Sequence, residues 1–290
     1  MSETLNQLGW LLPACLLLLG LCVGSFLNVV IYRLPLMLES QWRRNSIALL
    51  ELEEETTDRP LNLATPNSHC PHCGAPVKPW QNIPVVSYLL LRGKCGNCSV
   101  AISPRYPIIE LITGLVSLSL LWHFPPGTPL LGALILTWAL IALTMIDIDH
   151  QLLPDNITLP LLWLGLLFNI AGTFTALSSA VIGAAAGYLL LWSVYWLFKL
   201  ATGKEGMGYG DFKLLAALGA WMGWQVLPMI ILMSSVVGAV IGIALMVIKR
   251  RGREIPIAFG PYLAIAGWIT FVWGEQLLAA VPLFNMGAGP

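Results

Sequence analysis

Two aspartates stand at the margins of long apolar stretches, where an ionisable side chain is costly to place and is therefore a functional candidate. Asp211 ends the glycine-spaced sequence Gly-Met-Gly-Tyr-Gly-Asp, and Asp147 follows another apolar stretch. Two carboxyl groups in a partly dry site do not both ionise easily, so they share a proton. One then acts as a base toward water while the other protonates a peptide carbonyl. This pair of residues predicts aspartyl proteolysis.

Each aspartate also has a simpler interpretation. Asp211 precedes an apolar helix and would suit its N-terminus, where an aspartate accepts hydrogen bonds from first-turn amides. Asp147 has a competitor in Asp149, but positions two apart on a helix point about 200° away from each other, so only one of them faces Asp211. Asp149 and Asp155 are then expected in a solvated turn and at the cap of the next helix.

Four cysteines form a second constellation. Cys70, Cys73, Cys95 and Cys98 make two Cys-x-x-Cys pairs with 21 residues between them. Tetrahedral zinc takes four thiolates at this spacing, and a zinc ion with no open coordination position is structural. A redox dithiol fits either pair alone but not two matched pairs. The sequence therefore predicts a structural zinc ion, which clamps a segment with too little apolar content to fold unaided.

The chain that positions these groups has 290 residues, of which 57% are hydrophobic and 10% charged, and its mean hydropathy is +0.77. Apolar runs of about 20 residues cross the roughly 30 Å hydrocarbon core as helices, which keep their backbone hydrogen bonds internal. We predict an all-α polytopic membrane protein, with eight transmembrane helices in contact with lipid. The helices are expected at residues 8–31, 106–122, 130–146, 159–174, 180–198, 212–225, 228–248 and 257–279.

Changes in composition along the chain predict three parts. Residues 1–35 hold the first transmembrane helix. Residues 36–105 form a small cytoplasmic zinc-binding domain between the first and second helices. Residues 106–290 form a core of seven transmembrane helices that carries both candidate aspartates.

The distribution of charge predicts the orientation in the membrane. All 15 Lys and Arg residues fall within residues 33–105, 199–213 and 249–253. Loops rich in these residues stay in the cytoplasm, so the three clusters share that side and both termini lie outside it. Asp147 and Asp211 are then expected at one depth, near the cytoplasmic surface. Because topology explains the basic residues, nucleic-acid binding is not expected.

Two other classes of protein fit parts of the sequence. In a transporter or channel, Asp147, Asp211 and Glu110 would form an ion path through broken helices. The chain shows no evident inverted repeat, however, and its carboxylates cluster at one depth rather than at the bilayer midplane. A membrane scaffold held together by its zinc domain would leave the glycine and aspartate pattern unexplained. Glu110 is expected to pair with Arg105 at the membrane interface.

Several motifs together resemble one family. The Gly-x-Gly-Asp element that ends at Asp211 is similar to that of intramembrane aspartyl proteases such as presenilin and signal peptide peptidase. The resemblance to the bacterial type IV prepilin peptidases, which are also N-methyltransferases, is closer and covers nearly the whole chain. It rests on residues 24–35, both cysteine pairs, Arg-Tyr-Pro-x-x-Glu-Leu at 105–111, residues 147–155, residues 206–213 and Phe-Gly-Pro-Tyr at 259–262.

This resemblance implies a bifunctional enzyme of the bacterial inner membrane, with Asp147 and Asp211 as its catalytic aspartates. It would cleave the basic leader of type IV prepilins and of type II secretion pseudopilins on the cytoplasmic side, after a glycine. It would then methylate the new N-terminal amine, typically of phenylalanine, with S-adenosylmethionine. The zinc domain and first span are expected to contribute to methyl transfer. Gly93 is a candidate position, although a glycine beside a zinc knuckle also suits a turn.

Overall fold

The structure is a computed structural model that describes residues 9–52, 61–249 and 258–280. Within these ranges the chain is almost entirely helical, and its β-structure is limited to two isolated bridges. Length and composition allow five of the described helices to cross a membrane, and a shorter apolar helix covers Asp155–Ile170. The five are Leu11–Leu49, Arg105–Trp122, Thr128–His150, Leu177–Thr202 and Leu227–Ala244. The predicted all-α polytopic membrane fold is confirmed.

A helix corresponds to each of the eight predicted spans. These helices are α2 (Leu11–Leu49), α4 (Arg105–Ser119), α5 (Thr128–His150), α6 (Asp155–Ile170), α7 (Leu177–Thr202), α8 (Tyr209–Met222), α9 (Leu227–Lys249) and α10 (Gly260–Ala280). The first span was predicted to end at residue 31, but α2 continues through Pro35 to Leu49. Residue 257, and Arg250, Arg251 and Arg253 of the last basic cluster, lie outside the described residues.

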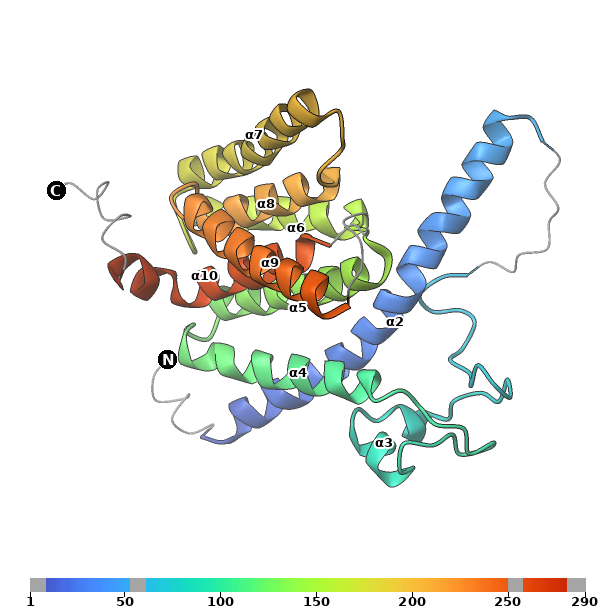
Figure 1. Ribbon diagram of the computed structural model, residues 1–290. Coiled ribbons are helices and arrows are strands. Elements are labelled where there is room, and N and C mark those ends of the chain that lie inside the picture. Colours follow the sequence, from blue (N-terminus) through green and yellow to red (C-terminus); the bar gives the residue numbers. More distant parts are fainter. Residues whose placement is uncertain (1–8, 53–60, 250–257, 281–290) are drawn as a thin grey trace. The chain divides into compact units, whose positions relative to one another are not determined.

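The chain forms two compact units, Met1–Trp122 and His123–Pro290. The first contains α2, α4, the four candidate metal ligands and the short helices η1 (Pro79–Asn82) and α3 (Val86–Leu90). The second contains α5 to α10 and both candidate aspartates (Figure 1). The division at residues 35 and 105 that composition indicates stays a prediction.

In the first unit, α2 and α4 pack closely through small residues. A Cβ added at Gly20 would lie 2.7 Å from Ser117 Oγ, and one added at Gly24 would lie 2.7 Å from the Cα of Glu110. Small residues four apart on a membrane helix allow this approach of two backbones. Asn28 Nδ2 also donates to Tyr106 O at 3.1 Å, joining the two helices by a polar contact. The contact at Gly24 places Glu110 directly against α2.

In the second unit, α8 forms the centre. Its 14 residues extend about 21 Å, which is less than the hydrocarbon thickness of a bilayer. Residues 214–221 are buried without interruption, as expected of a helix that is apolar on every side. Helices α6, α7 and α10 pack against it (Figure 1). The first turn of this enclosed helix carries Asp211.

One buried side chain holds the far end of α8. Asn169 Nδ2 donates to Ala220 O at 2.9 Å and to Trp221 O at 3.0 Å, two carbonyls near the end of α8. Its Oδ1 accepts from the backbone N–H groups of Phe174 and Thr175, both at 3.0 Å. The last carbonyls of a helix have no partner within it, so Asn169 supplies one from the end of α6.

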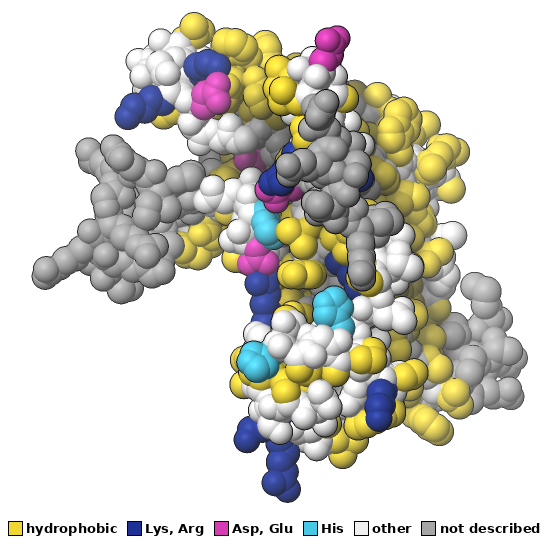
Figure 2. Space-filling view, turned by 90° about the vertical axis from the view of Figure 1, so that its right-hand side faces the viewer, with side chains coloured by type: hydrophobic (Ala, Val, Ile, Leu, Met, Phe, Trp, Pro, Cys, Tyr) yellow, Lys and Arg dark blue, Asp and Glu magenta, His cyan; other side chains and the backbone are white. Residues whose placement is uncertain are grey.

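On the face shown in Figure 2, hydrophobic side chains cover much of the surface, above all on its right-hand side. The exposed set includes large residues on several spans, such as Leu18 and Phe26 on α2 and Leu197 on α7. A water-facing surface rarely carries apolar patches of this extent. The surface therefore agrees with a protein embedded in lipid.

The contact between α7 and α8 yields a testable prediction. A Cβ added at Gly183 would clash with the backbone of Gly219, and one at Gly187 would lie 2.6 Å from Leu215 O. We expect Gly183→Leu to destabilise the protein in detergent by about 1–3 kcal/mol, because two packed backbones must separate. Thermal unfolding would measure this, with Ala185→Leu, on an exposed position of α7, as the matched control. Equal melting temperatures for both variants would contradict it.

Candidate active site and metal centre

Asp211 lies in the first turn of α8, and only 6% of its surface is exposed. Gly208 is the N-cap of this helix, and its backbone N–H donates to the Asp211 carboxylate. This is the backward contact of a capping residue at the third helical position, so the simpler interpretation of Asp211 is partly right. Capping leaves the second oxygen, Oδ1, buried and with no hydrogen-bond partner among the described residues. An unpaired buried oxygen is costly, so it calls for a function.

Asp147 lies in the last turn of α5, with 5% of its surface exposed. The backbone N–H of Gly260, the first residue of α10, donates to its carboxylate. A Cβ added at Gly260 would lie 2.5 Å from Asp147 Oδ2, so only glycine allows this approach without a shift. Asp149 is exposed, and it is Asp147 that faces the interior.

The two aspartates lie in the same region of the second unit although 63 residues of sequence separate them. The backbone of Gly260 lies against the Asp147 carboxylate, and the two aspartates are near enough to interact electrostatically. Helix α10 packs against both α5 and α8 and so joins the two ends. The side chain of Leu153 packs against the starts of both α8 and α10. It would lie 2.7 Å from a Cβ added at Gly210 and 3.1 Å from a Cβ added at Gly260. The structure therefore brings together the two residues that the sequence singled out.

Asp155 has a different position from the one predicted. It is the first residue of α6, directly after the N-cap residue Pro154. Both of its carboxylate oxygens lie 2.7 Å from Lys213 Nζ. Lys213 follows Asp211 by two residues, so this ion pair joins the start of α6 to the start of α8. The cap of α6 is therefore Pro154 and not Asp155, which lies one residue beyond the predicted position. The ion pair was not predicted, because Lys213 comes from a distant part of the sequence.

Aromatic rings pack around the first turn of α8, next to Asp211 in the sequence. Tyr195 of α7, Tyr209 and Phe212 contact one another with ring centroids 5.4–5.7 Å apart. Lys199 Nζ donates to Tyr195 Oη at 3.2 Å and to Glu205 Oε1 at 2.8 Å. This ion pair holds the pKa of Glu205 below its ordinary value, through the hydrogen bond from Lys199. The segment between α7 and α8 is thus fixed at both ends.

In the first unit, the four sulfur atoms of Cys70, Cys73, Cys95 and Cys98 all lie within 4.8 Å of one another, and none forms a disulfide. Two of them, Cys70 Sγ and Cys98 Sγ, are 3.8 Å apart. Tetrahedral zinc with bonds of about 2.3 Å requires sulfur atoms about 3.8 Å apart. Asn97 Nδ2 donates to Cys73 Sγ at 3.5 Å, and this hydrogen bond is the largest of several that together lower the Cys73 pKa to about 6, toward the thiolate that a metal needs.

The two cysteine pairs have the same local fold. Each turn closes by a backbone hydrogen bond to its first cysteine, from Gly74 N to Cys70 O and from Ser99 N to Cys95 O. The residue after each second cysteine has a positive φ, 69° at Gly74 and 59° at Ser99. The flanking residues form the bridges His69–Pro76 and Lys94–Ala101 at matching positions. Two equivalent turns thus present four thiols to one point, and these residues can hold a metal ion.

Gly93 has the geometry of a turn. Its φ is +67°, which glycine adopts without cost, and its N–H donates to Tyr88 O at 2.9 Å. A Cβ there would lie 2.9 Å from the Tyr88 hydroxyl oxygen. The structure thus gives Gly93 a conformational reason to be glycine. A role in methyl transfer stays a prediction.

Glu110 is buried in the first unit. Its Oε2 accepts from Val85 N at 2.7 Å, and Ser25 also forms a hydrogen bond to the carboxylate. Sequence reasoning considered only the neighbouring Arg105 as its partner, and that pairing stays a prediction. Val85 and Ser25 were missed because they lie far from Glu110 in the sequence. The signal that was available is Gly20-x-x-x-Gly24, a close-packing pattern on the same helix as Ser25.

The contact between Gly260 and Asp147 gives a prediction for the active site. We expect Gly260→Ala to reduce proteolysis about 10²-fold, because the new Cβ displaces the Asp147 carboxylate from its backbone donor. Gly274→Ala is the control on the same helix, since its nearest neighbour, Thr270 Cγ2, would be 3.7 Å away. The initial cleavage rate of a purified peptide substrate in detergent would measure both. Equal rates would show that Gly260 does not position Asp147.

Comparison with known proteins supplies the family. The family model for the Bacterial Peptidase A24 N-terminal domain matches residues 18–124, and that for the Type IV leader peptidase family matches residues 134–243. The prepilin leader peptidase/N-methyltransferase of Stutzerimonas stutzeri is 56% identical over 275 residues, covering 95% of this chain and 94% of the relative. Its counterparts in Pseudomonas aeruginosa and Neisseria gonorrhoeae are 57% and 52% identical, each covering 91% of both chains. No solved structure matches significantly. The chain belongs to the prepilin leader peptidase/N-methyltransferase family.

Proposed function

We propose that Asp147 and Asp211 are the catalytic pair with which this enzyme cleaves the leader peptide of prepilins. The chain is a peptidase and an N-methyltransferase by its family and its relatives. One observation carries the assignment of residues: Asp211 Oδ1 is buried, has no hydrogen-bond partner in the part of the chain that the structure describes, and lies near a second buried carboxylate. The charges of a transport path would be expected deeper in the membrane.

Two close carboxyl groups in an enclosed site hold one proton between them. The ionised member takes a proton from a water molecule, and that water attacks the scissile carbonyl carbon. The protonated member donates its proton to the carbonyl oxygen. Hydrogen bonds from Gly208 and Gly260 hold each carboxylate in place, which keeps both groups aligned for this exchange. The titration belongs to the pair rather than to either residue.

Methyl transfer completes the proposed function. The relatives' names include N-methyltransferase, and we assign the new N-terminal amine of the pilin as the acceptor and S-adenosylmethionine as the donor. We propose zinc as the metal of the four-cysteine cluster, because four sulfur donors in a tetrahedral arrangement suit it. Bound there, zinc fixes the fold of the segment and supplies no chemistry of its own. Gly93 remains a candidate for the donor site.

The enzyme is a multi-pass protein of the inner membrane. We propose that the cysteine cluster and the aspartate pair face the cytoplasm and that both termini lie on the other side. The three basic clusters support this orientation. Pseudopilins of type II secretion are proposed as further substrates. Their apolar helices would pack against the spans in lipid while the leader stays in the cytoplasm. Chemical labelling of Lys213 of the enzyme from each side of the membrane would check the proposed orientation.

The proposal is tested by assaying two reactions in one preparation of detergent-solubilised protein. The first is cleavage of a purified prepilin, and the second is methylation of a pilin that has already been cleaved. Aspartate variants that lose the first reaction and keep the second would support the assignment. Cleavage by variants of both aspartates would overturn it.

A further inference from the structure

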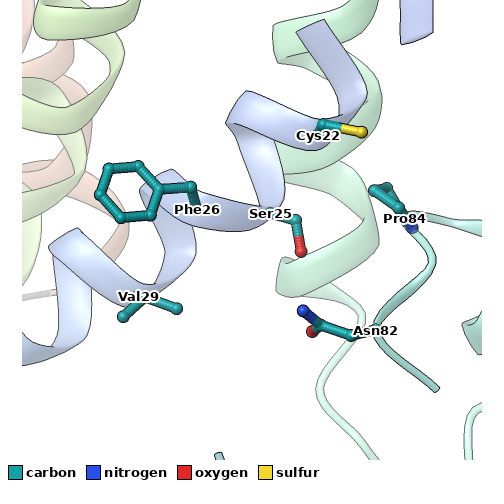
Figure 3. A pocket seen from close by; sticks show the side chains of 6 residues that line it. All are labelled: Cys22, Ser25, Phe26, Val29, Asn82 and Pro84. Carbon is teal, nitrogen blue, oxygen red and sulfur yellow. The ribbon is translucent and has the colours of Figure 1, made fainter. Parts of the chain in front are cut away.

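A small cavity of about 260 Å³ lies in the first unit between α2 and the chain around the end of η1. Figure 3 shows Ser25 on α2 facing Asn82 and Pro84 across it. Its full lining is Cys22, Ser25, Phe26, Val29, Asn82 and Pro84. Pockets for whole small molecules measure about 300–1,000 Å³, so this one suits a single side chain. The lining is mainly apolar and contains no charged residue.

A carboxylate is connected to the lining of this cavity by a hydrogen bond. Glu110 of α4 accepts a hydrogen bond from Ser25, which lines the cavity, and one from Val85 N, which follows the lining residue Pro84. Val85 has a φ of 59°, a conformation that β-branched residues rarely adopt, and this conformation presents its N–H to Glu110. These two hydrogen bonds therefore hold the carboxylate in a fixed position behind Ser25, one of the lining residues.

This combination matches a particular ligand chemistry. An apolar cavity accepts a hydrophobic side chain, and a carboxylate next to it accepts an ammonium group. An N-terminal residue with an apolar side chain carries both groups on one carbon atom. The methyl donor fits less well, because it is larger than the cavity and its own carboxylate would find no lysine or arginine in the lining.

We propose that this cavity and Glu110 bind the N-terminal residue of the cleaved pilin as the methyl acceptor, and that Glu110 removes a proton from its amine. The inference rests on the N-methyltransferase activity given above. A free α-amine has a pKa near 8, so at neutral pH most of it is ammonium and has no lone pair for attack. Ser25 and the Val85 N–H position the carboxylate that accepts the proton.

The step balances as follows. An N–H bond of the ammonium breaks, and an O–H bond forms on Glu110. The free lone pair of the amine then forms a bond to the methyl carbon of the sulfonium donor, while the S–CH₃ bond breaks and its electron pair stays on sulfur. The products are a methylammonium group and a thioether. Glu110 returns its proton to water, so each turnover releases one proton.

The first test is Glu110→Gln, assayed with S-adenosylmethionine and a synthetic peptide that begins with the first residue of the mature pilin. At pH 7 we expect the methylation rate to fall about tenfold, because about a tenth of an amine with a pKa near 8 is already free at that pH and still reacts without a base. Leader cleavage should stay within about twofold of wild type. Above pH 9 water deprotonates the amine, so the variant should recover most of its rate. A deficit equal at every pH would mean a structural role, and full activity at pH 7 would equally overturn the proposal.

The second test concerns the cavity itself. Val29→Phe should fill it and raise the KM for a peptide that begins with phenylalanine at least tenfold, with a smaller effect on one that begins with alanine. Leu19→Phe, at an exposed position of α2 outside the lining, is the matched control. An unchanged KM for both peptides would show that the acceptor binds elsewhere. If wild type methylates neither peptide while it cleaves prepilin, the methyltransferase function itself fails, which is a separate result.

Discussion

Replacing Asp211 by asparagine is expected to reduce leader cleavage by about 10²–10⁴-fold or more, and Asp147→Asn should have an effect of similar size. An amide has nearly the shape of a carboxyl group, but it neither takes a proton from water nor passes one to a carbonyl oxygen. Both side chains are buried in the same region, so bulk water does not readily take over the proton transfer that either of them performs. The initial rate of prepilin cleavage, measured with folded protein in detergent, checks this.

Two exposed carboxylates provide matched controls. Asp149 lies two residues from Asp147 and is exposed, and Asp155 is half exposed in its ion pair with Lys213. Asp149→Asn and Asp155→Asn should keep most of the cleavage rate, because exposed charges and exposed ion pairs contribute little. All four variants should still methylate a pilin that is already cleaved. Retained cleavage in both Asp147→Asn and Asp211→Asn would disprove the aspartyl mechanism.

The sequence was sufficient to predict that the two aspartates lie at one depth, for a physical reason. Each lies at the end of an apolar helix, and helices that cross a membrane have few possible arrangements, so topology alone places their ends at one level. The metal cluster of the four cysteines could also be predicted from the sequence, because metal coordination imposes a spacing that is visible within a short stretch of the chain. Both predictions used constraints that act within short stretches of the chain.

Contacts between residues that are distant in the sequence could not be predicted in this way. The hydrogen bond from Gly260 to Asp147, the ion pair of Lys213 with Asp155 and the position of Glu110 beside Ser25 all depend on which helices are neighbours. A single sequence specifies the span ends more firmly than the order of helices around α8. The pattern Gly183-Ala-Ala-Ala-Gly187 is a partial signal, since small residues four apart mark a helix contact without naming the partner.

The length of the first helix was underestimated for a related reason. Its apolar stretch ends near the residue that composition indicates, and Pro35 is a common sign of a helix end. The helix nevertheless continues to Leu49 through polar sequence. Hydropathy reports the part of a helix that lies in lipid, whereas backbone hydrogen bonding continues beyond it.

Removing the metal from the four-cysteine cluster is expected to abolish methyl transfer. Neither η1 nor α3, which lie between the two cysteine pairs, buries a single residue, so the segment has little hydrophobic core of its own. Structural zinc contributes about 10–16 kcal/mol to such folds. Without it, the segment that carries Asn82, Pro84 and the Val85 N–H loses its fixed position beside Glu110. Cys98→Ser should therefore lose both the zinc and the methylation rate.

Leader cleavage should respond differently to the same change. The buried core around Phe212 and Trp221 lies wholly within the second unit, as do both aspartates, so this unit keeps its own packing when the cysteine cluster opens. We expect Cys98→Ser to keep at least about a tenth of the cleavage rate while methylation falls below detection. Zinc per chain, measured by elemental analysis alongside both activities, checks this, with Cys15→Ser as a control at an exposed cysteine outside the cluster. Methylation at the wild-type rate by a zinc-free protein would show that the cluster does not organise the acceptor site.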